Sequence, residues 1–329
     1  MRGDIVNRAG DRLAMHLLEE KYLEPLKPEL ESIISGTAHR RMVRLGGRAL
    51  AEASAGCPTP LPLLLALPEA PEGRVAPSLL AHLAIQAGIE LDVGKSATYR
   101  QGGAGALYAL ADALALLSTG AVQQVLVGGV DTCLDLMRLG RLDAEGRTYG
   151  SRSRLGFLPG EGAAFLLLRG NGPGARGAPS PSGPPAMARV LGVGTGEEKG
   201  HRYSKEPYRG EGLADAFEAL FQHIPSTQPK VRCVYAGFNG EEMPAKEWGV
   251  ARLRNSERFA EEVQVEHPAD CIGDSGAALG PIMLGLAAVA ISQGYLPEPR
   301  PIWAEGDPGP CLVWCASDRA PRAAALLQR

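Results

Sequence analysis

The sequence predicts an α/β protein in which layers of helices cover the sheets. Residues 102–120 and 281–293 form two helical stretches that are rich in alanine and apolar on nearly every side, as helices at the centre of a protein are. Short apolar runs beside glycines, such as 125–127, are typical of strands buried on both faces. These runs alternate with helical stretches along the chain, and that alternation predicts layered packing.

Length and composition narrow the class of protein. The 329 residues suit two packed halves or one large α/β domain. A net charge of −3 gives no reason to expect nucleic acid or an anionic membrane as a partner. No window approaches the ~20 apolar residues of a membrane helix, and no apolar run of signal-peptide length follows Met1. We therefore expect a chain without a membrane span.

The six cysteines are scattered, mostly inside apolar runs. Cys311 and Cys315 are the only close pair, and their spacing fits neither a disulfide loop nor a zinc site. Buried, reduced thiols in a cytoplasmic protein are the better interpretation. We expect no metal and no cofactor.

The first elements are a mixture of helices and strands. A helical pattern runs from Leu13 to Tyr22, and Thr37–Ala53 is a clearer amphipathic helix. The arginines of the second helix are expected on its solvated face, with anion binding as the lesser alternative; they are Arg40, Arg41, Arg44 and Arg48. The next predicted elements are a buried strand at 61–67, a helix at 77–88 and an extended run at 91–99.

The helix at 102–120 opens with a glycine run and closes at Gly120, where glycine commonly ends a helix. The following strand is expected to stop at Gly128-Gly129. A short helix at 134–139 and a glycine-rich turn with a long apolar strand at 156–168 come next. No strand is apparent before residue 10.

Residues 170–186 are rich in glycine, proline and serine, which predicts a flexible linker between an N-terminal half, 1–169, and a C-terminal half, 187–329. The elements predicted beyond it are strands at 188–194 and 231–236, helices at 212–224 and 247–261, a loop at 268–279, the helix at 281–293, and a strand pair at 311–316 and 323–328.

Three stretches together resemble the β-ketoacyl synthase branch of the thiolase superfamily. They are the helix at 102–120 with its glycine-ended strand, the stretch GFLPGEGAAFLLL at 156–168, and GDSGAALG at 273–280 with the helix after it. The resemblance covers roughly residues 60–329 and implies a thiolase-like layered fold with two related α/β halves and buried central helices. The family begins with a strand that has no evident counterpart here, so the first strand is expected to be missing.

The family's catalytic Cys-His-His residues have no match in this chain. Its nucleophilic cysteine falls on Gly103, or on Gly102 if a gap intervenes, and its two histidines fall on Gly237 and Asp274. Glycine cannot be acylated, and an ionised aspartate would repel the forming enolate. Two further departures are Ala269, where the family has a lysine, and 317–321, where it has a GFGG loop.

Two functions remain open. The first is a catalytically degenerate ketosynthase-like protein that acts by binding. The family forms two-fold dimers through the strand near the nucleophile, here about Ser96–Arg100, so a homodimer or a heterodimer with a homologue is expected. Chain-length-factor subunits lack the cysteine and act as partners. Similar proteins accompany bacterial type VI secretion effectors, which implies a secretion-associated adaptor with a client protein.

The second function is a β-ketoacyl-ACP synthase or acyltransferase whose nucleophile has moved. Cys271, with Asp274 and Ser275 beside it and His267 upstream, is the candidate, and Asn239, Glu241 and Glu242 lie in a loop that the fold would bring nearby. The simpler interpretation makes Cys271 a small buried residue and Asp274 a loop or capping residue. An open, apolar cavity would keep an acyl ligand in consideration.

Overall fold

The computed structural model describes residues 2–6, 12–69, 78–150, 156–170, 185–296 and 309–329. Its strands are β1 Arg2–Val6, β2 Arg12–His16, β3 Leu63–Ala66, β4 Ala97–Tyr99, β5 Gln124–Thr132, β6 Glu161–Arg169, β7 Arg189–Glu197, β8 Val231–Ala236, β9 Phe259–Glu266, β10 Cys311–Ala316 and β11 Pro321–Gln328. Its helices are α1 Pro28–Glu31, α2 Thr37–Ser54, α3 Leu79–Ala87, α4 Gly105–Ser118, α5 Leu136–Ala144, α6 Glu211–Phe221, α7 Glu242–Arg254, α8 Ala269–Ile272 and α9 Leu279–Gln293.

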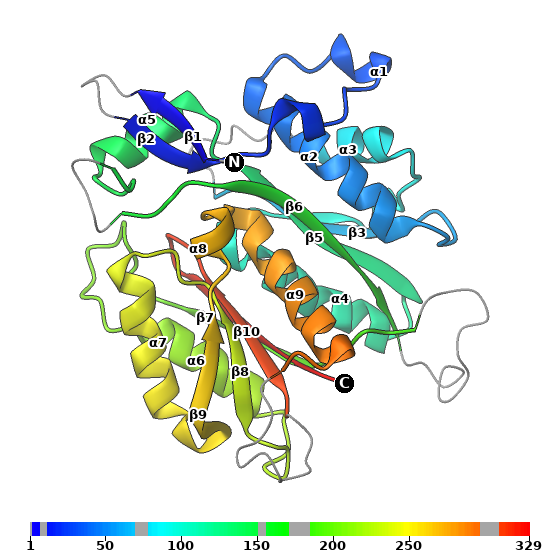
Figure 1. The fold of residues 1–329 in the computed structure, drawn as a ribbon. Coiled ribbons are helices and arrows are strands. Elements are labelled where there is room, and N and C mark those ends of the chain that lie inside the picture. The colour runs from blue at the N-terminus through cyan, green and yellow to red at the C-terminus, as the bar shows by residue number, and fades with distance from the viewer. Residues whose placement is uncertain (1, 7–11, 70–77, 151–155, 171–184, 297–308) are drawn as a thin grey trace.

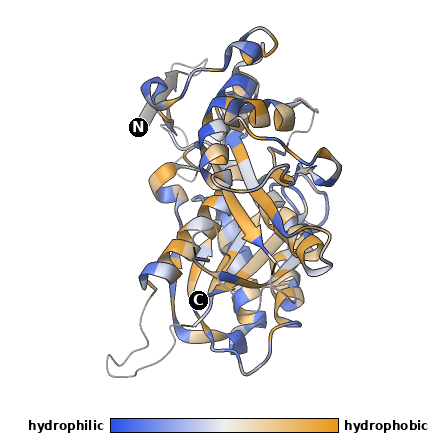
Figure 2. Ribbon diagram, turned by 90° about the vertical axis from the view of Figure 1, so that its right-hand side faces the viewer, coloured by the Kyte–Doolittle hydropathy of each residue, from blue (hydrophilic) through white to orange (hydrophobic). Residues whose placement is uncertain are grey.

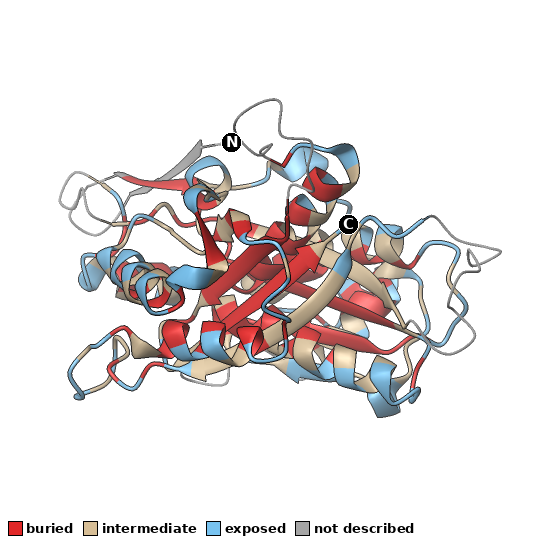
Figure 3. Cartoon of the chain, turned by 90° about the horizontal axis from the view of Figure 1, so that it is seen from below, coloured by how far each residue is buried: buried red, intermediate tan, exposed pale blue. Residues whose placement is uncertain are grey.

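The helices and sheets form five layers (Figure 1). The buried helices α4 and α9 lie between the two sheets, and both pack on apolar residues of each sheet. Helices α2 and α3 cover the outer face of the first sheet, and α6 and α7 cover that of the second. The apolar and buried residues gather on the central strands and on the helix faces toward them (Figures 2 and 3). The α/β layered prediction is confirmed.

The two sheets share one topology. The first has the order β4-β3-β5-β6, and the second, read from its far end, has the order β9-β8-β10-β11-β7. In both, three neighbouring strands are parallel and the next is antiparallel to them. The buried helix enters at the same point of each half, α4 before β5 and α9 before β10. The halves are therefore related, as expected.

The counterpart of β7 is absent from the first sheet in the part of the chain that the structure describes. Contrary to expectation, a strand does occur before residue 10, but β1 pairs only with β2 in a separate two-stranded sheet. The expectation that the first sheet lacks its first strand is confirmed. The predicted linker falls mostly on residues 171–184, which lie outside the described residues, so that boundary stays a prediction.

Strand β5 runs through Gly128 and Gly129 instead of stopping there. A Cβ atom at Gly128 would lie 2.2 Å from the Phe165 ring, and one at Gly129 would lie 2.2 Å from the carbonyl oxygen of Ala277. The two glycines do not break the strand. They allow Phe165 and the backbone of Ala277 to lie close against it.

Three other local predictions were wrong. The predicted helix at Leu13–Tyr22 is strand β2 followed by a single 3₁₀ turn, and the predicted helix at 247–261 is α7 followed by strand β9. The predicted loop at 268–279 contains the short helix α8 and a 3₁₀ turn. Residues 259–261 are extended because β9 pairs in parallel with β8.

One helical segment of the described chain, Gly276–Gln293, is long and apolar enough to cross a membrane by length and composition. About half of it, 56%, is buried inside the fold, where it forms the helix between the two sheets. A core helix meets the same criteria.

Candidate functional site

A cavity of about 100 Å³ lies where the N-terminal ends of α4 and α9 meet the ends of several strands. It brings together Gly103, Gly237 and Asp274, which are the positions expected to replace the family's catalytic residues. The volume leaves room for a few water molecules and falls short of the about 300–1,000 Å³ of typical ligand pockets. The geometry thus unites all three predicted positions in one small site.

The two buried helices begin in the same way. Gly102 and Gly276 each have a φ of +54° and each opens a 3₁₀ turn that continues into the helix. This left-handed backbone favours glycine over any residue with a side chain. Both turns line the cavity, so the positive ends of two helix dipoles point toward it.

Internal side chains already occupy these helix ends. The Ala104 N–H donates to Ser317 Oγ at 3.2 Å, and the Ser317 hydroxyl donates to the Gln101 carbonyl. At the other helix, the Ala277 N–H donates to Asp131 Oδ2 at 3.0 Å, and the Gly276 N–H donates to Asp274 Oδ1 at 2.9 Å. These three N–H groups, which could otherwise stabilise a ligand anion or a thiolate, therefore have acceptors within the chain.

Gly103 leaves no space for a longer side chain. A Cβ atom there would lie 2.7 Å from the carbonyl oxygen of Ala316, closer than real Cβ contacts. A Cβ atom at Gly237 would lie 3.1 Å from the carbonyl oxygen of Trp314. The backbone of β10 therefore lies where side chains at positions 103 and 237 would have to begin.

Asp274 is held by two donors. Asn239 Nδ2 donates to its Oδ2 at 2.8 Å, and the Gly276 N–H donates to its Oδ1. Burial raises the pKa of the Asp274 carboxyl above its ordinary value. Of the two simpler interpretations, loop or capping residue, Asp274 matches the loop residue: it lies between α8 and the 3₁₀ turn at Gly276–Ala278, whose N-cap is Ser275.

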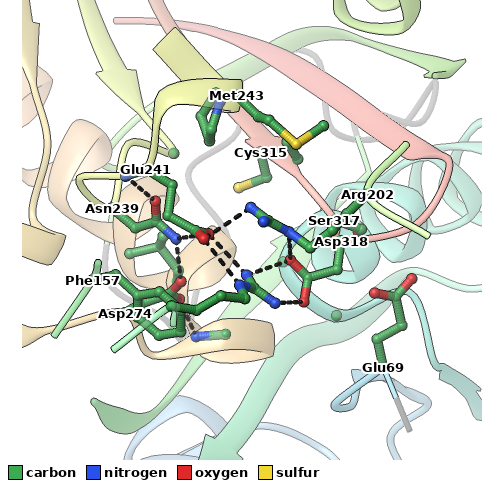
Figure 4. Close-up of a pocket in the computed structure, with 18 of the residues that line it drawn as sticks. Glu69, Phe157, Arg202, Asn239, Glu241, Met243, Asp274, Cys315, Ser317 and Asp318 are labelled. Carbon is green, nitrogen blue, oxygen red and sulfur yellow. Dashed lines mark hydrogen bonds and ion pairs between the residues drawn. The ribbon is translucent and has the colours of Figure 1, made fainter. Parts of the chain in front are cut away.

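Arg147 lines the cavity and binds Glu241 and Asp318, whose carboxylates point toward each other in Figure 4. Its side chain is 5% exposed, and its guanidinium binds both oxygens of Glu241 at 2.9 and 2.8 Å and both oxygens of Asp318 at 2.8 and 2.7 Å. Arg202 approaches the same two carboxylates, at 2.8 Å and 3.7 Å. Although burial opposes its charge, the pKa of Asp318 is held below the ordinary value by hydrogen bonds and charge from Arg147. Arg147 thus joins the loop after α5 in the first half to the loops of Glu241 and Asp318 in the second half.

The structure does not bring Cys271 and His267 into the cavity lining with Asp274. Cys271 is exposed on α8 and is absent from the cavity lining, and His267 Nδ1 lies 2.8 Å from Asp270 instead. The expectation of a buried Cys271 is wrong. Sequence reasoning missed Cys315, which is 1% exposed and lines the cavity. Burial raises the pKa of its thiol well above the ordinary value, so the thiol stays protonated.

Arg41 is also not where the sequence placed it. The expected solvated face holds for Arg48 and in part for Arg40, whose side chains are 65% and 36% exposed. Arg41 is 5% exposed and binds both oxygens of Glu161 at 2.6 Å. The periodicity of α2 shows that Arg41 is polar, but it cannot show that a buried carboxylate on another element, Glu161 of β6, binds it.

Glu69 is a further cavity residue that the sequence did not indicate. Burial, and then the charge of Asp318, raises the pKa of its carboxyl from 4.5 to about 7. The folded state therefore keeps a proton that the unfolded chain releases at lower pH. The stabilisation from Glu69 is complete below pH 4.5 and is lost as the pH rises to about 7.

We expect Glu69→Gln to become more stable relative to wild type as the pH rises from 5 to 8, because glutamine cannot release a proton. Urea unfolding at both pH values measures the change. The matched control is Glu262→Gln, at an exposed position on β9, which should show no such trend. An equal difference between Glu69→Gln and wild type at both pH values would contradict this assignment.

Comparison with known proteins gives a consistent fold and a weaker sequence signal. No protein-family model matches the chain. The chain is 26% identical over 246 residues to the ketoacyl synthase alpha subunit of the tetracenomycin polyketide synthase of Streptomyces glaucescens. The matched segment covers 71% of this chain and 55% of that protein. The chain therefore spans about half the length of this relative.

Solved structures agree over nearly the whole chain. The ketosynthase from module 6 of the bacillaene synthase of Bacillus subtilis 168 superposes with a TM-score of 0.70 at 15% identity, over 93% of this chain and 62% of that one. The ishigamide ketosynthase/chain length factor superposes with a TM-score of 0.65 at 16% identity, over 96% of this chain and 87% of that one.

The fold is that of the ketosynthases. At these identities the likeness establishes the thiolase-like fold, with its helices and two mixed sheets. A likeness of fold carries no conclusion about chemistry, which has to be argued from the residues in the cavity.

Proposed function

We propose that this ketosynthase-like chain is catalytically degenerate and acts by binding another protein, as a partner subunit or as an adaptor. The observation that carries the proposal is the occupied cavity. Arg147, Glu241 and Asp318 form an ion-paired cluster in the lining of the small cavity that also holds Gly103, Gly237 and Asp274, where acyl chemistry would need a thiolate and room for an acyl chain. A secretion-associated role and a place in the cytoplasm are parts of the same proposal.

The edge of β4 supports association. Ala97 and Thr98 are exposed, and among the described strands β4 pairs with β3 alone, at the end of the first sheet. An open strand edge can pair with the same strand of a second chain across a two-fold axis. A homodimer, or a heterodimer with a ketosynthase-like homologue, would form through this edge.

The test measures mass and acyl transfer together. The purified chain, alone and co-expressed with a ketosynthase-like protein encoded beside it, is examined by light scattering, and Ala97→Glu should abolish the dimer because two carboxylates would face each other. Glu261→Lys, at an exposed position on β9, is the control and should keep the dimer. Incubation with malonyl- and acyl-loaded carrier protein should give neither a condensation product nor an acyl adduct by mass spectrometry.

A monomer under all these conditions would overturn the binding role. An acyl adduct would favour the alternative, a β-ketoacyl-ACP synthase or acyltransferase. Thiol labelling alone would not, because Cys271 is exposed and should be alkylated in either case. No cluster of three or more potential metal ligands occurs among the described residues.

Replacing Gly103 by cysteine should not restore condensation. The new Cβ atom would contact the Ala316 carbonyl at 2.7 Å, and the positions of both family histidines are Gly237 and Asp274. We expect Gly103→Cys to be less stable than wild type and to form no condensation product in the same carrier-protein assay. Product formation by this variant would mean that the cavity retains the rest of a condensing site.

A further inference from the structure

The outer edge of β6 is the second open edge of the first sheet. On its inner side β6 pairs with β5 along its whole length, from Glu161 opposite Thr132 to Arg169 opposite Gln124. On its outer side, no strand and no backbone hydrogen bond reaches residues 162–168 from the part of the chain that the structure describes. The sequence of this edge is GAAFLLL, without charge or proline.

An apolar, uncharged edge of this length is unusual. Natural sheets protect open edges with lysine, proline or bulges because such edges pair with other chains. The edge strand β9 of the second sheet carries Glu261 and Glu262 at exposed positions, whereas the open edge of β6 has no such protection. This difference indicates that the edge of β6 is normally covered.

The second half shows what covers the equivalent edge. There β11 occupies the place of β6, and β7 lies antiparallel along its outer side, from Pro321 opposite Glu197 to Gln328 opposite Arg189. Helix α4 also packs on β7, and the Tyr108 hydroxyl donates to the Gly196 carbonyl at 3.1 Å. An equivalent strand in the first half would therefore pair with the outer edge of β6 and pack on α9.

Helix α9 has an exposed apolar strip at that place. A Cβ atom at Gly162 would lie 3.2 Å from Ile282, and one at Gly285 would lie 3.9 Å from Leu166, so this face of α9 contacts β6. Leu286 and Val289, on the same face, are 42% and 39% exposed. A strand along β6 would cover both side chains, as β7 covers α4.

The N-terminal strands of the chain are engaged elsewhere. β1 and β2 pair with each other over five residues each. After β2 the chain touches only the beginning of β6: the His16 N–H donates to the Pro159 carbonyl at 2.9 Å, and the Leu18 N–H donates to Glu161 Oε1 at 2.8 Å. It then turns into a 3₁₀ turn at Glu20–Tyr22 and leaves the rest of the edge open.

We infer that the outer edge of β6 binds an extended strand of a partner polypeptide, antiparallel to β6, with apolar side chains at alternate positions directed toward Leu286 and Val289. Backbone hydrogen bonds would supply much of the affinity, and the apolar strip would supply specificity. The inference rests on the proposed binding function and names a second surface for it, apart from the edge of β4.

The test uses a synthetic peptide with the sequence RVLGVGTGE of β7, because β7 fills the equivalent place. Fluorescence anisotropy measures binding of the labelled peptide to the full chain, and amide hydrogen exchange locates it. We expect saturable binding and slower exchange in residues 162–168. The double variant Leu286→Lys/Val289→Lys should weaken binding by about tenfold or more. Leu253→Lys, at a position 77% exposed on α7, should leave it unchanged.

Three outcomes would overturn the inference. One is no binding and no change in exchange up to about 1 mM peptide. Another is slow exchange of 162–168 in the free chain at every concentration, which would mean that the chain covers its own edge. The third is protection that grows with protein concentration, which would identify a second copy as the occupant. Failure here leaves dimerisation through β4 intact, and loss of that dimer in Ala97→Glu leaves peptide binding intact, so the two proposals fail separately.

Discussion

Replacing Arg322 by methionine is expected to lower the free energy of unfolding by about 3–5 kcal/mol, the usual effect of breaking a buried ion pair. Arg322 and Glu247 have side chains that are 3% and 1% exposed, and the guanidinium binds both carboxylate oxygens at 2.6 Å. Methionine fills a similar volume but leaves Glu247 buried without a counter-charge. Urea unfolding followed by circular dichroism measures the change.

The same guanidinium also holds the turn beside the cavity. Its Nη1 donates to the carbonyls of Ser317, Arg319 and Pro321 at 2.8, 2.6 and 3.0 Å. The variant should therefore loosen Ser317, which caps the start of α4, and amides at 102–104 should exchange faster.

The double variant Arg322→Met/Glu247→Leu is the control, because it removes both charges at once. It should recover more than half of the lost stability, since replacing a whole buried pair by apolar residues is often neutral. A loss below about 1 kcal/mol in the single variant would contradict the assignment, because that is the range of exposed ion pairs.

What the sequence predicted was local. Helix α4 was predicted with its closing glycine because its residues are apolar all round and Gly120, with a φ of +72°, stands at its end. The strand pair at the C-terminus and the helix α9 followed from the same kind of pattern. In each case the signal is contained in about fifteen consecutive residues.

What the sequence missed depends on residues far apart in the chain. Arg147 lies 94 residues from Glu241 and 171 from Asp318, so no window contains its partners. Cys315 ends a buried strand, and only the folded chain places it beside the cavity. The sequence pointed to the glycines at 103, 237 and 128–129, but it could not show the close approach of other residues that requires glycine there.

Gly129→Ala is expected to have the second large effect, because the added methyl group has no free volume to occupy. Its Cβ atom would lie 2.2 Å from the Ala277 carbonyl oxygen and 3.3 Å from Ala66, between β5 and the turn that opens α9. Overpacking of a well-packed core costs about 1–3 kcal/mol, and more where backbone has to move. We expect at least the upper end of this range, since a carbonyl oxygen has to shift.

Gly140→Ala is the matched control for this prediction. Gly140 lies inside α5, and a Cβ atom there would meet nothing within 4 Å. Alanine in such a helix position should stabilise the protein by about 0.5–1 kcal/mol. Thermal and urea unfolding of both variants therefore gives changes of opposite sign from the same chemical substitution. If Gly129→Ala were as stable as wild type, β5 and α9 would not be in the close contact that shapes the cavity, and the occupied site would lose its structural basis.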